Sequence, residues 1–110
     1  MNSQEYLTFI QTPSYAKAAK RLIVDDLQRE IELTICADPE CGKLEAGVRK
    51  VRIALPGKGK RGGARVVYYH IARKGKVYLL DLFAKNEKTA LTNAEKNEVR
   101  ELTKELEKDQ

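Results

Sequence analysis

Three basic residues with a spacing suited to holding a phosphate lie on two neighbouring predicted strands. Lys50 and Arg52 are two residues apart in the segment 48–55, so they share one face of a strand. Arg65 begins the next strand after a loop, and antiparallel pairing would bring it beside them. Gathering three cations costs self-repulsion unless an anion is present. The pattern therefore predicts a site for a phosphate-bearing ligand.

The loop between these strands, residues 56–63, adds positive charge and backbone freedom. It contains four glycines and one proline, together with Lys58, Lys60 and Arg61. Glycines allow backbone N–H groups to approach a phosphate, and the basic side chains supply charge there. The loop lacks a Gly-Lys-Ser/Thr ending and leads into a strand, which argues against a nucleotide-binding P-loop. A solvated, charged hairpin loop is the alternative, but we expect contact with phosphates.

Positive charge is concentrated in the middle of the chain. Between residues 46 and 80 there are ten Lys or Arg residues and no Asp or Glu, within a net charge of +5 for all 110 residues. A cationic segment with no acid of its own is typical of proteins that bind a polyphosphate such as RNA. The same strands carry Tyr68, Tyr69, Tyr78 and Phe83, of which we expect about half to stack on bases and the rest to be core.

Residues for other chemistries are scarce. His70 is the single histidine, with no acid nearby in the cationic segment, so we expect a structural histidine and no Ser-His-Asp triad. Cys36 and Cys41 have no second Cys pair and predict reduced thiols near a helix end, not a zinc site. We expect no metal and no cofactor. The first ten residues lack a signal-peptide pattern, and no apolar run is long enough for a membrane, so a cytoplasmic location is expected.

Hydrophobic periodicity predicts the elements that position these residues. In chain order they are a strand over 5–11, one helix over 15–37 or two with a break near 23–26, strands over 48–55, 65–72 and 77–83, and a helix from 92 or 93 to about 108. Thr12 and Pro13 suit a helix start, and Asp38-Pro39 a helix end. The order predicts an α+β fold: a small twisted, mainly antiparallel sheet with N-terminal helices and a C-terminal helix packed on it.

Two segments carry a family resemblance. Residues 47–71 (GVRKVRIALPGKGKRGGARVVYYHI) and 77–96 (VYLLDLFAKNEKTALTNAEK) strongly resemble the HigB branch of the RelE-like toxins of type II toxin–antitoxin systems. The resemblance covers about residues 40–105. It implies a single RelE-like toxin domain over 1–110, and a bacterial endoribonuclease that cleaves mRNA in the ribosomal decoding site and so inhibits translation.

The resemblance also implies roles for individual residues. Lys50, Arg65 and Lys85 match the catalytic cations. RNA contacts fall to the remaining basic and polar positions, which are Arg52, Lys58, Lys60, Arg61 and Asn86. Asn86 stands where the family usually has an arginine, and the tyrosine often found near the final helix has no counterpart at 91–93.

The implied reaction needs no metal, because RNA supplies its own nucleophile. The 2′-hydroxyl attacks the adjacent phosphate and leaves a cyclic phosphate and a free 5′-hydroxyl. The protein orients the backbone and stabilises charge on the phosphorane. Lys50 would act as base if the neighbouring cations favour its neutral form. Arg65 would hold the phosphate oxygens, and Lys85 would assist charge stabilisation or the leaving group.

The implied partners are the ribosome, mRNA and a helix-turn-helix antitoxin similar to HigA, with operator DNA contacted only through the antitoxin and no membrane partner. We expect the antitoxin to cover the cationic face or to lie beside it. From the residues alone, two other functions stay open. One is a non-catalytic RNA-binding module that uses the same cations and tyrosines, and the other is a degenerate toxin homologue that acts only through protein contacts.

Overall fold

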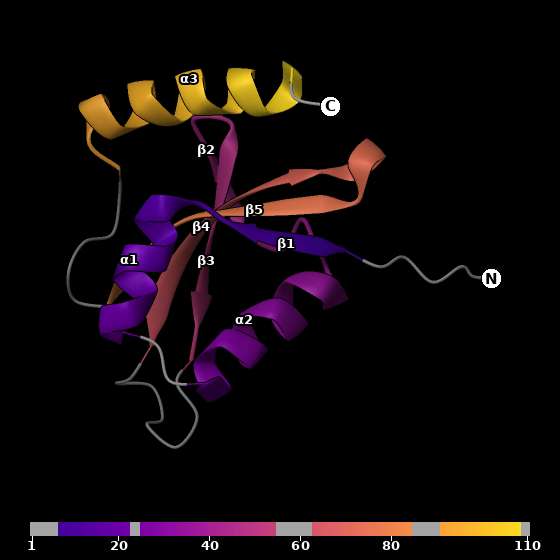
Figure 1. The fold of residues 1–110 in the computed structure, drawn as a ribbon, viewed down its shortest axis with the longest axis vertical. Coiled ribbons are helices and arrows are strands. Elements are labelled where there is room, and N and C mark those ends of the chain that lie inside the picture. The colour runs from indigo at the N-terminus through magenta and orange to yellow at the C-terminus, as the bar shows by residue number, and fades with distance from the viewer. Residues whose placement is uncertain (1–6, 23–24, 55–62, 85–90, 109–110) are drawn as a thin grey trace.

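The computed structural model describes residues 7–22, 25–54, 63–84 and 91–108 as a five-stranded sheet with helices on both faces (Figure 1). The elements, in chain order, are β1 (Thr8–Gln11), α1 (Pro13–Leu22), α2 (Asp25–Ala37), β2 (Lys43–Glu45), β3 (Val48–Ile53), β4 (Ala64–Ile71), a 3-10 turn (Ala72–Lys74), β5 (Lys76–Ala84) and α3 (Asn93–Lys108). The predicted α+β class is confirmed.

The sheet has the strand order β1-β5-β4-β3-β2. Strands β3, β4 and β5 form the predicted antiparallel meander, and β2 extends it as a fourth antiparallel strand. Strand β1 pairs with β5 in parallel, with Thr8 opposite Lys76 and Gln11 opposite Leu79. The sheet is therefore mainly antiparallel, as the sequence predicts, with one parallel strand at its edge.

Side-chain caps fix where the helices begin. The backbone N–H of Tyr15 donates to Thr12 Oγ1 at 3.4 Å, which confirms Thr12 as the cap of α1. At the start of α3, the N–H of Glu95 donates to Thr92 Oγ1 at 3.1 Å, and the N–H of Thr92 donates to Glu95 Oε1 at 2.9 Å. This reciprocal pair is a capping box and satisfies two backbone donors that the helix itself leaves free.

Each face of the sheet has its own apolar core. On one face, Tyr15 and Ile31 from α1 and α2 pack with Val66, Tyr68 and Leu79, and all five are fully buried. On the other face lies α3, which contributes a stripe of half-buried residues, Val99, Leu102 and Leu106. No side chain of α3 is fully buried. Figure 1 shows α3 on the opposite side of the sheet from α1 and α2.

One feature agrees with a sequence-based alternative and one differs from expectation. Helices α1 and α2 are separate, as in the two-helix alternative, and α2 ends before Asp38-Pro39 as predicted. Strand β2 lies in what the sequence indicates only as a connector. It pairs with β3 through a two-residue hairpin at Ala46 and Gly47, whose φ angles are 55° and 87°. Two positive φ angles are typical of a type I′ turn, so turn geometry and not periodicity creates this strand.

Candidate functional site

Four basic residues come together on the face of the sheet that also carries α3. In the register of β3 and β4, Arg52 lies opposite Arg65, and in that of β2 and β3, Lys43 lies opposite Lys50. Residues that alternate along a strand share a face, so all four point to the same side. They line a pocket of about 230 Å³ together with Val51, which we call the cation pocket. The predicted convergence of Lys50, Arg52 and Arg65 is therefore present.

Lys43 belongs to this pocket although sequence reasoning missed it. Its place depends on β2, whose three residues are too few to show a strand period. The one local signal is the Gly at position 47, which ends a two-residue turn and would fold residues 43–45 back onto β3.

Arg65 presents an unused hydrogen-bond donor. Its Nε atom is buried and has no hydrogen-bond partner in the described part of the chain. Buried polar atoms in proteins are nearly always paired, so such an atom in a cationic pocket points to a ligand that accepts a hydrogen bond. Phe83 lies opposite Arg65 on β5 and is half-buried.

The positive charge of the middle segment is partly neutralised, which corrects the expectation of an uncompensated patch. Lys50 Nζ lies 2.8 Å from Glu45 Oε1, and Arg49 lies 3.9 Å from Glu40. Arg73 pairs with a glutamate of α3, Glu107. None of these three glutamates lies between residues 46 and 80. Folding therefore brings negative charge from other parts of the chain to a segment that has no Asp or Glu of its own.

Glu45 is held by several donors at once. The hydrogen bond from Lys50 lowers the pKa of Glu45 most, with further lowering by the charge of Lys96 and a hydrogen bond from the backbone N–H of Leu91. Lys96 Nζ lies 3.7 Å from Glu45 Oε2. The side chains of Glu45 and Lys50 are 18% and 14% exposed, so this pair is largely shielded from water.

Two of the four aromatic residues on these strands are buried, and the other two are half-buried and packed against the core on the α3 face. Tyr68 and Tyr78 are buried and cannot stack on a base. The Tyr68 hydroxyl donates to the carbonyl of Pro39 at 2.8 Å, and burial raises its pKa. Tyr69 is half-buried, and its hydroxyl donates to Glu107 at 2.6 Å; desolvation and this carboxylate raise the pKa of Tyr69 to about 12. Phe83, beside Arg65, is the best placed of the four for contact with a base.

Five predicted site residues lie outside the described residues. They are Lys58, Lys60, Arg61, Lys85 and Asn86. The described strand ends nearest to them in the chain, Ala64 and Ala84, pair with each other next to Arg65 and Phe83.

The described residues contain no group of three or more His, Cys, Asp or Glu side chains that could hold a metal ion. Cys36 and Cys41 are exposed and free. None of the helices in the described ranges is long and apolar enough to cross a membrane.

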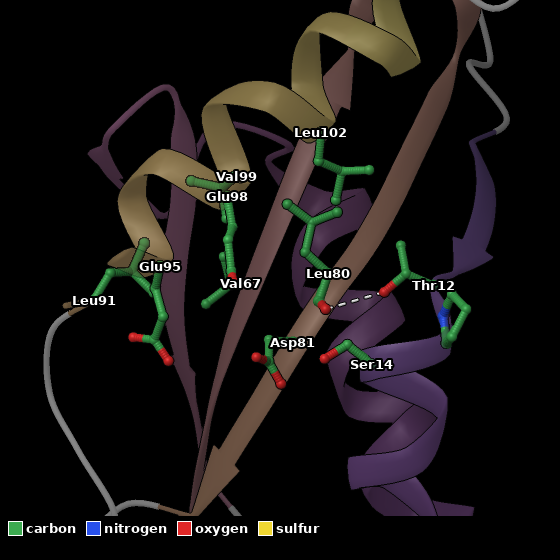
Figure 2. Close-up of a pocket in the computed structure, with 11 residues that line it drawn as sticks. Thr12, Ser14, Val67, Leu80, Asp81, Leu91, Glu95, Glu98, Val99 and Leu102 are labelled. Carbon is green, nitrogen blue, oxygen red and sulfur yellow. Dashed lines mark hydrogen bonds between the residues drawn. The ribbon is translucent and has the colours of Figure 1, made fainter. Parts of the chain in front are cut away.

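A second pocket, of about 380 Å³, lies between α3, the strands β4 and β5, and the start of α1. Its walls are mostly apolar, including Val67 and Leu80, but it also holds the carboxylates of Asp81, Glu95 and Glu98. Figure 2 shows the carboxylates of Asp81 and Glu95 at the same end of this pocket. Three carboxylates repel a phosphodiester, so of the two pockets the cation pocket is the one suited to RNA.

Comparison with known proteins agrees with the fold. Residues 9–110 match the family model described as the RelE toxin of the RelE / RelB toxin-antitoxin system. The fold is similar to a solved structure of the E. coli toxin RelE, an arginine-to-alanine double mutant in the free state. The two are 17% identical with a TM-score of 0.53, over 76% of this chain and 86% of that one. The chain belongs to the RelE toxin family of toxin–antitoxin systems.

Proposed function

We propose that this chain is a ribosome-dependent mRNA endoribonuclease of the HigB branch, acting as a toxin in the bacterial cytoplasm. The observation that carries the proposal is the cation pocket, in which Arg65 has a buried donor that no described residue pairs with, beside Arg52 and Lys50. The resemblance of residues 47–71 and 77–96 to that branch supports the finer assignment.

In the proposed reaction the pocket holds the scissile phosphate. Arg65 donates to its non-bridging oxygens, and Arg52 adds charge from the opposite strand. As the 2′-oxygen bonds to phosphorus, its proton passes to water, and when the P–O5′ bond breaks the 5′-oxygen takes up a proton from water. Fixed cations stabilise the negative charge that grows on the phosphorane between these two steps, without a metal. Lys85 would stabilise the leaving 5′-oxygen, and Lys58, Lys60, Arg61 and Asn86 would hold the RNA backbone.

Lys50 fits the role of a fixed cation better than that of a base. The carboxylate of Glu45 at 2.8 Å stabilises a positive charge on Lys50. If Lys50 were neutral, the largely shielded carboxylate of Glu45 would lose its strongest ion-pair partner. We therefore propose that Lys50 takes part as an ammonium group, which stabilises the phosphorane together with Arg65.

A RelE-family toxin pairs with an antitoxin. We propose that the partner of this chain is a helix-turn-helix antitoxin similar to HigA, and that the complex contacts operator DNA only through it. The face of the sheet that carries α3 holds both the cation pocket and the second pocket with its three carboxylates. This mixed charge supports binding of a protein partner with complementary charges, which would block RNA from the cation pocket.

The test is cleavage of a defined mRNA on purified ribosomes, with the cut ends mapped and their chemistry determined. The expected products carry a 2′,3′-cyclic phosphate and a 5′-hydroxyl, and their formation continues when an exchange-inert cation replaces free magnesium after the complex is assembled. Binding to ribosomes without any cut would favour a non-catalytic RNA-binding module. Neither binding nor cutting would favour a degenerate homologue.

A further inference from the structure

Glu45 lies between the cation pocket and the first turn of α3. It takes its position from the β2–β3 hairpin, in which Glu45 pairs with Val48 and Lys43 with Lys50. One carboxylate oxygen contacts Lys50 of the pocket, and the other faces Lys96 of α3. The same carboxylate accepts a hydrogen bond from the backbone of Leu91, two residues before α3 begins.

The hairpin that places Glu45 contains a strained residue. Ala46, directly after Glu45, has a φ of 55°, a conformation that costs a residue with a Cβ roughly 1–2 kcal/mol. Strain of this kind persists only where the surrounding structure maintains it, and it often lies near functional sites.

The charge of Glu45 works against binding of an anion. A carboxylate in contact with Lys50 offsets one of the four positive charges of the pocket, and the lowered pKa of Glu45 keeps it ionised at neutral pH. A residue that only bound RNA would not be acidic at this position. A positioning role would explain it, because a free lysine has a long flexible stem and must lose rotamer freedom whenever it acts from a fixed place.

We propose that Glu45 is a positioning residue of the phosphate site. It anchors the ammonium of Lys50 before RNA binds, and through Leu91 and Lys96 it ties that anchor to α3. The anchored charge is thereby preorganised for the phosphorane, at the expense of affinity for the ground-state phosphate. The expected effect of Glu45 on cleavage rests on the proposed nuclease function. The anchoring of Lys50 by Glu45 does not depend on that function.

The test is Glu45→Gln, which keeps the shape of the side chain and removes its charge. The probe for binding is a short RNA with 2′-O-methyl groups, which cannot be cut, and cleavage is followed on ribosomes with an unmodified mRNA. We expect the variant to bind the probe about 3- to 10-fold more tightly, and to cleave about 10-fold more slowly once bound. Glu40→Gln is the matched control, since it removes the same charge from an exposed glutamate that pairs with Arg49, and should change neither quantity.

These two opposite changes separate positioning from a merely structural role. Damage to the fold would weaken both RNA binding and cleavage, and that result would overturn the proposal. Equal binding and equal cleavage rates in Glu45→Gln and Glu40→Gln would also overturn it. The anchoring is measured separately by NMR of the lysine ammonium groups, in which the Lys50 signal should lose order in Glu45→Gln. An unchanged Lys50 signal would overturn the anchoring. Absence of cleavage by the unmodified protein would instead overturn the nuclease proposal, while the binding and NMR results would still decide the role of Glu45.

Discussion

Arg52 and Arg65 lie directly opposite each other on adjacent antiparallel strands, with their side chains on the same face of the sheet. Like charges in this relationship destabilise a sheet by about 0.2–1 kcal/mol relative to a neutral pair. The arrangement is therefore not explained by stability. We propose that an anion binds between the two guanidinium groups, and that the register of β3 and β4 places them for it before it binds.

Replacing Arg65 with alanine should abolish toxicity without unfolding the protein. Removal of one preorganised charge at a phosphorane costs on the order of 10²–10³ in rate, whereas relief of the repulsion from Arg52 leaves stability unchanged or slightly higher. Growth after induction and thermal unfolding of the purified variant measure the two effects. Arg100→Ala, on the exposed surface of α3, is the control and should remain toxic. Growth arrest by Arg65→Ala at equal expression would contradict the site assignment.

Acid should loosen the attachment of α3. Hydrogen bonds from Lys50 to Glu45 and from Tyr69 to Glu107 lower the pKa of both carboxylates, with ion pairs to Lys96 and Arg73 adding to the effect. A carboxyl group with a lowered pKa in the folded state stabilises the protein at neutral pH, and this contribution is lost as the pH falls below about 5 toward the folded-state value. We expect the melting temperature to fall more steeply between about pH 5 and pH 3 in the unmodified protein than in the double variant Glu45→Gln, Glu107→Gln. Parallel curves for the two proteins would show that these carboxylates do not hold α3.

Glycine at position 46 should stabilise the protein. Ala46 has a φ of 55°, which glycine adopts without a steric penalty, so we expect Ala46→Gly to raise the free energy of unfolding by about 0.5–1 kcal/mol. Urea unfolding at constant m-value measures the change. In the opposite direction, Ala94→Gly in the exposed first turn of α3 should destabilise, because it introduces glycine into a helix. A loss of stability in Ala46→Gly would mean that the turn is not strained in solution.

The antitoxin should neutralise the chain by direct binding. Co-expression with the product of the adjacent antitoxin gene should restore growth and give a complex that co-purifies. Because both pockets on this face are charged, we expect the association rate to fall steeply as salt is raised, while dissociation changes little. Stopped-flow mixing at several ionic strengths measures this. An association rate independent of salt would show that apolar contacts, not charge, guide the encounter.

The strand period was sufficient to predict that Lys50, Arg52 and Arg65 converge on one face of the sheet. Lys50 and Arg52 share a face because they are two residues apart, and Arg65 joins them because a meander fixes its pairing. The cap at Thr12 was equally local and equally predictable. These features depend on residues that are close together in the sequence, so they can be predicted from the sequence alone.

The features that the sequence did not reveal depend on contacts between distant segments. Glu45 and Lys43 lie on a strand that exists only because of a two-residue turn. Tyr68 and Tyr69 are adjacent in the sequence, but the first points to α1 and α2 and the second to α3, and a strand with helices on both faces is apolar on both sides. The glutamates that neutralise the cationic segment likewise reach it only in the folded chain.

The parallel pairing of β1 with β5 has a consequence for synthesis of the toxin. Thr8 emerges from the ribosome long before Lys76, its partner in the sheet, and at about 5–20 residues per second the interval lasts several seconds. Until then β1 has no strand to pair with, and the core beneath α1 lacks Leu79, to which Thr12 is also bonded. The β1 edge of the sheet and the core beneath α1 can therefore form only after β5 has been synthesised.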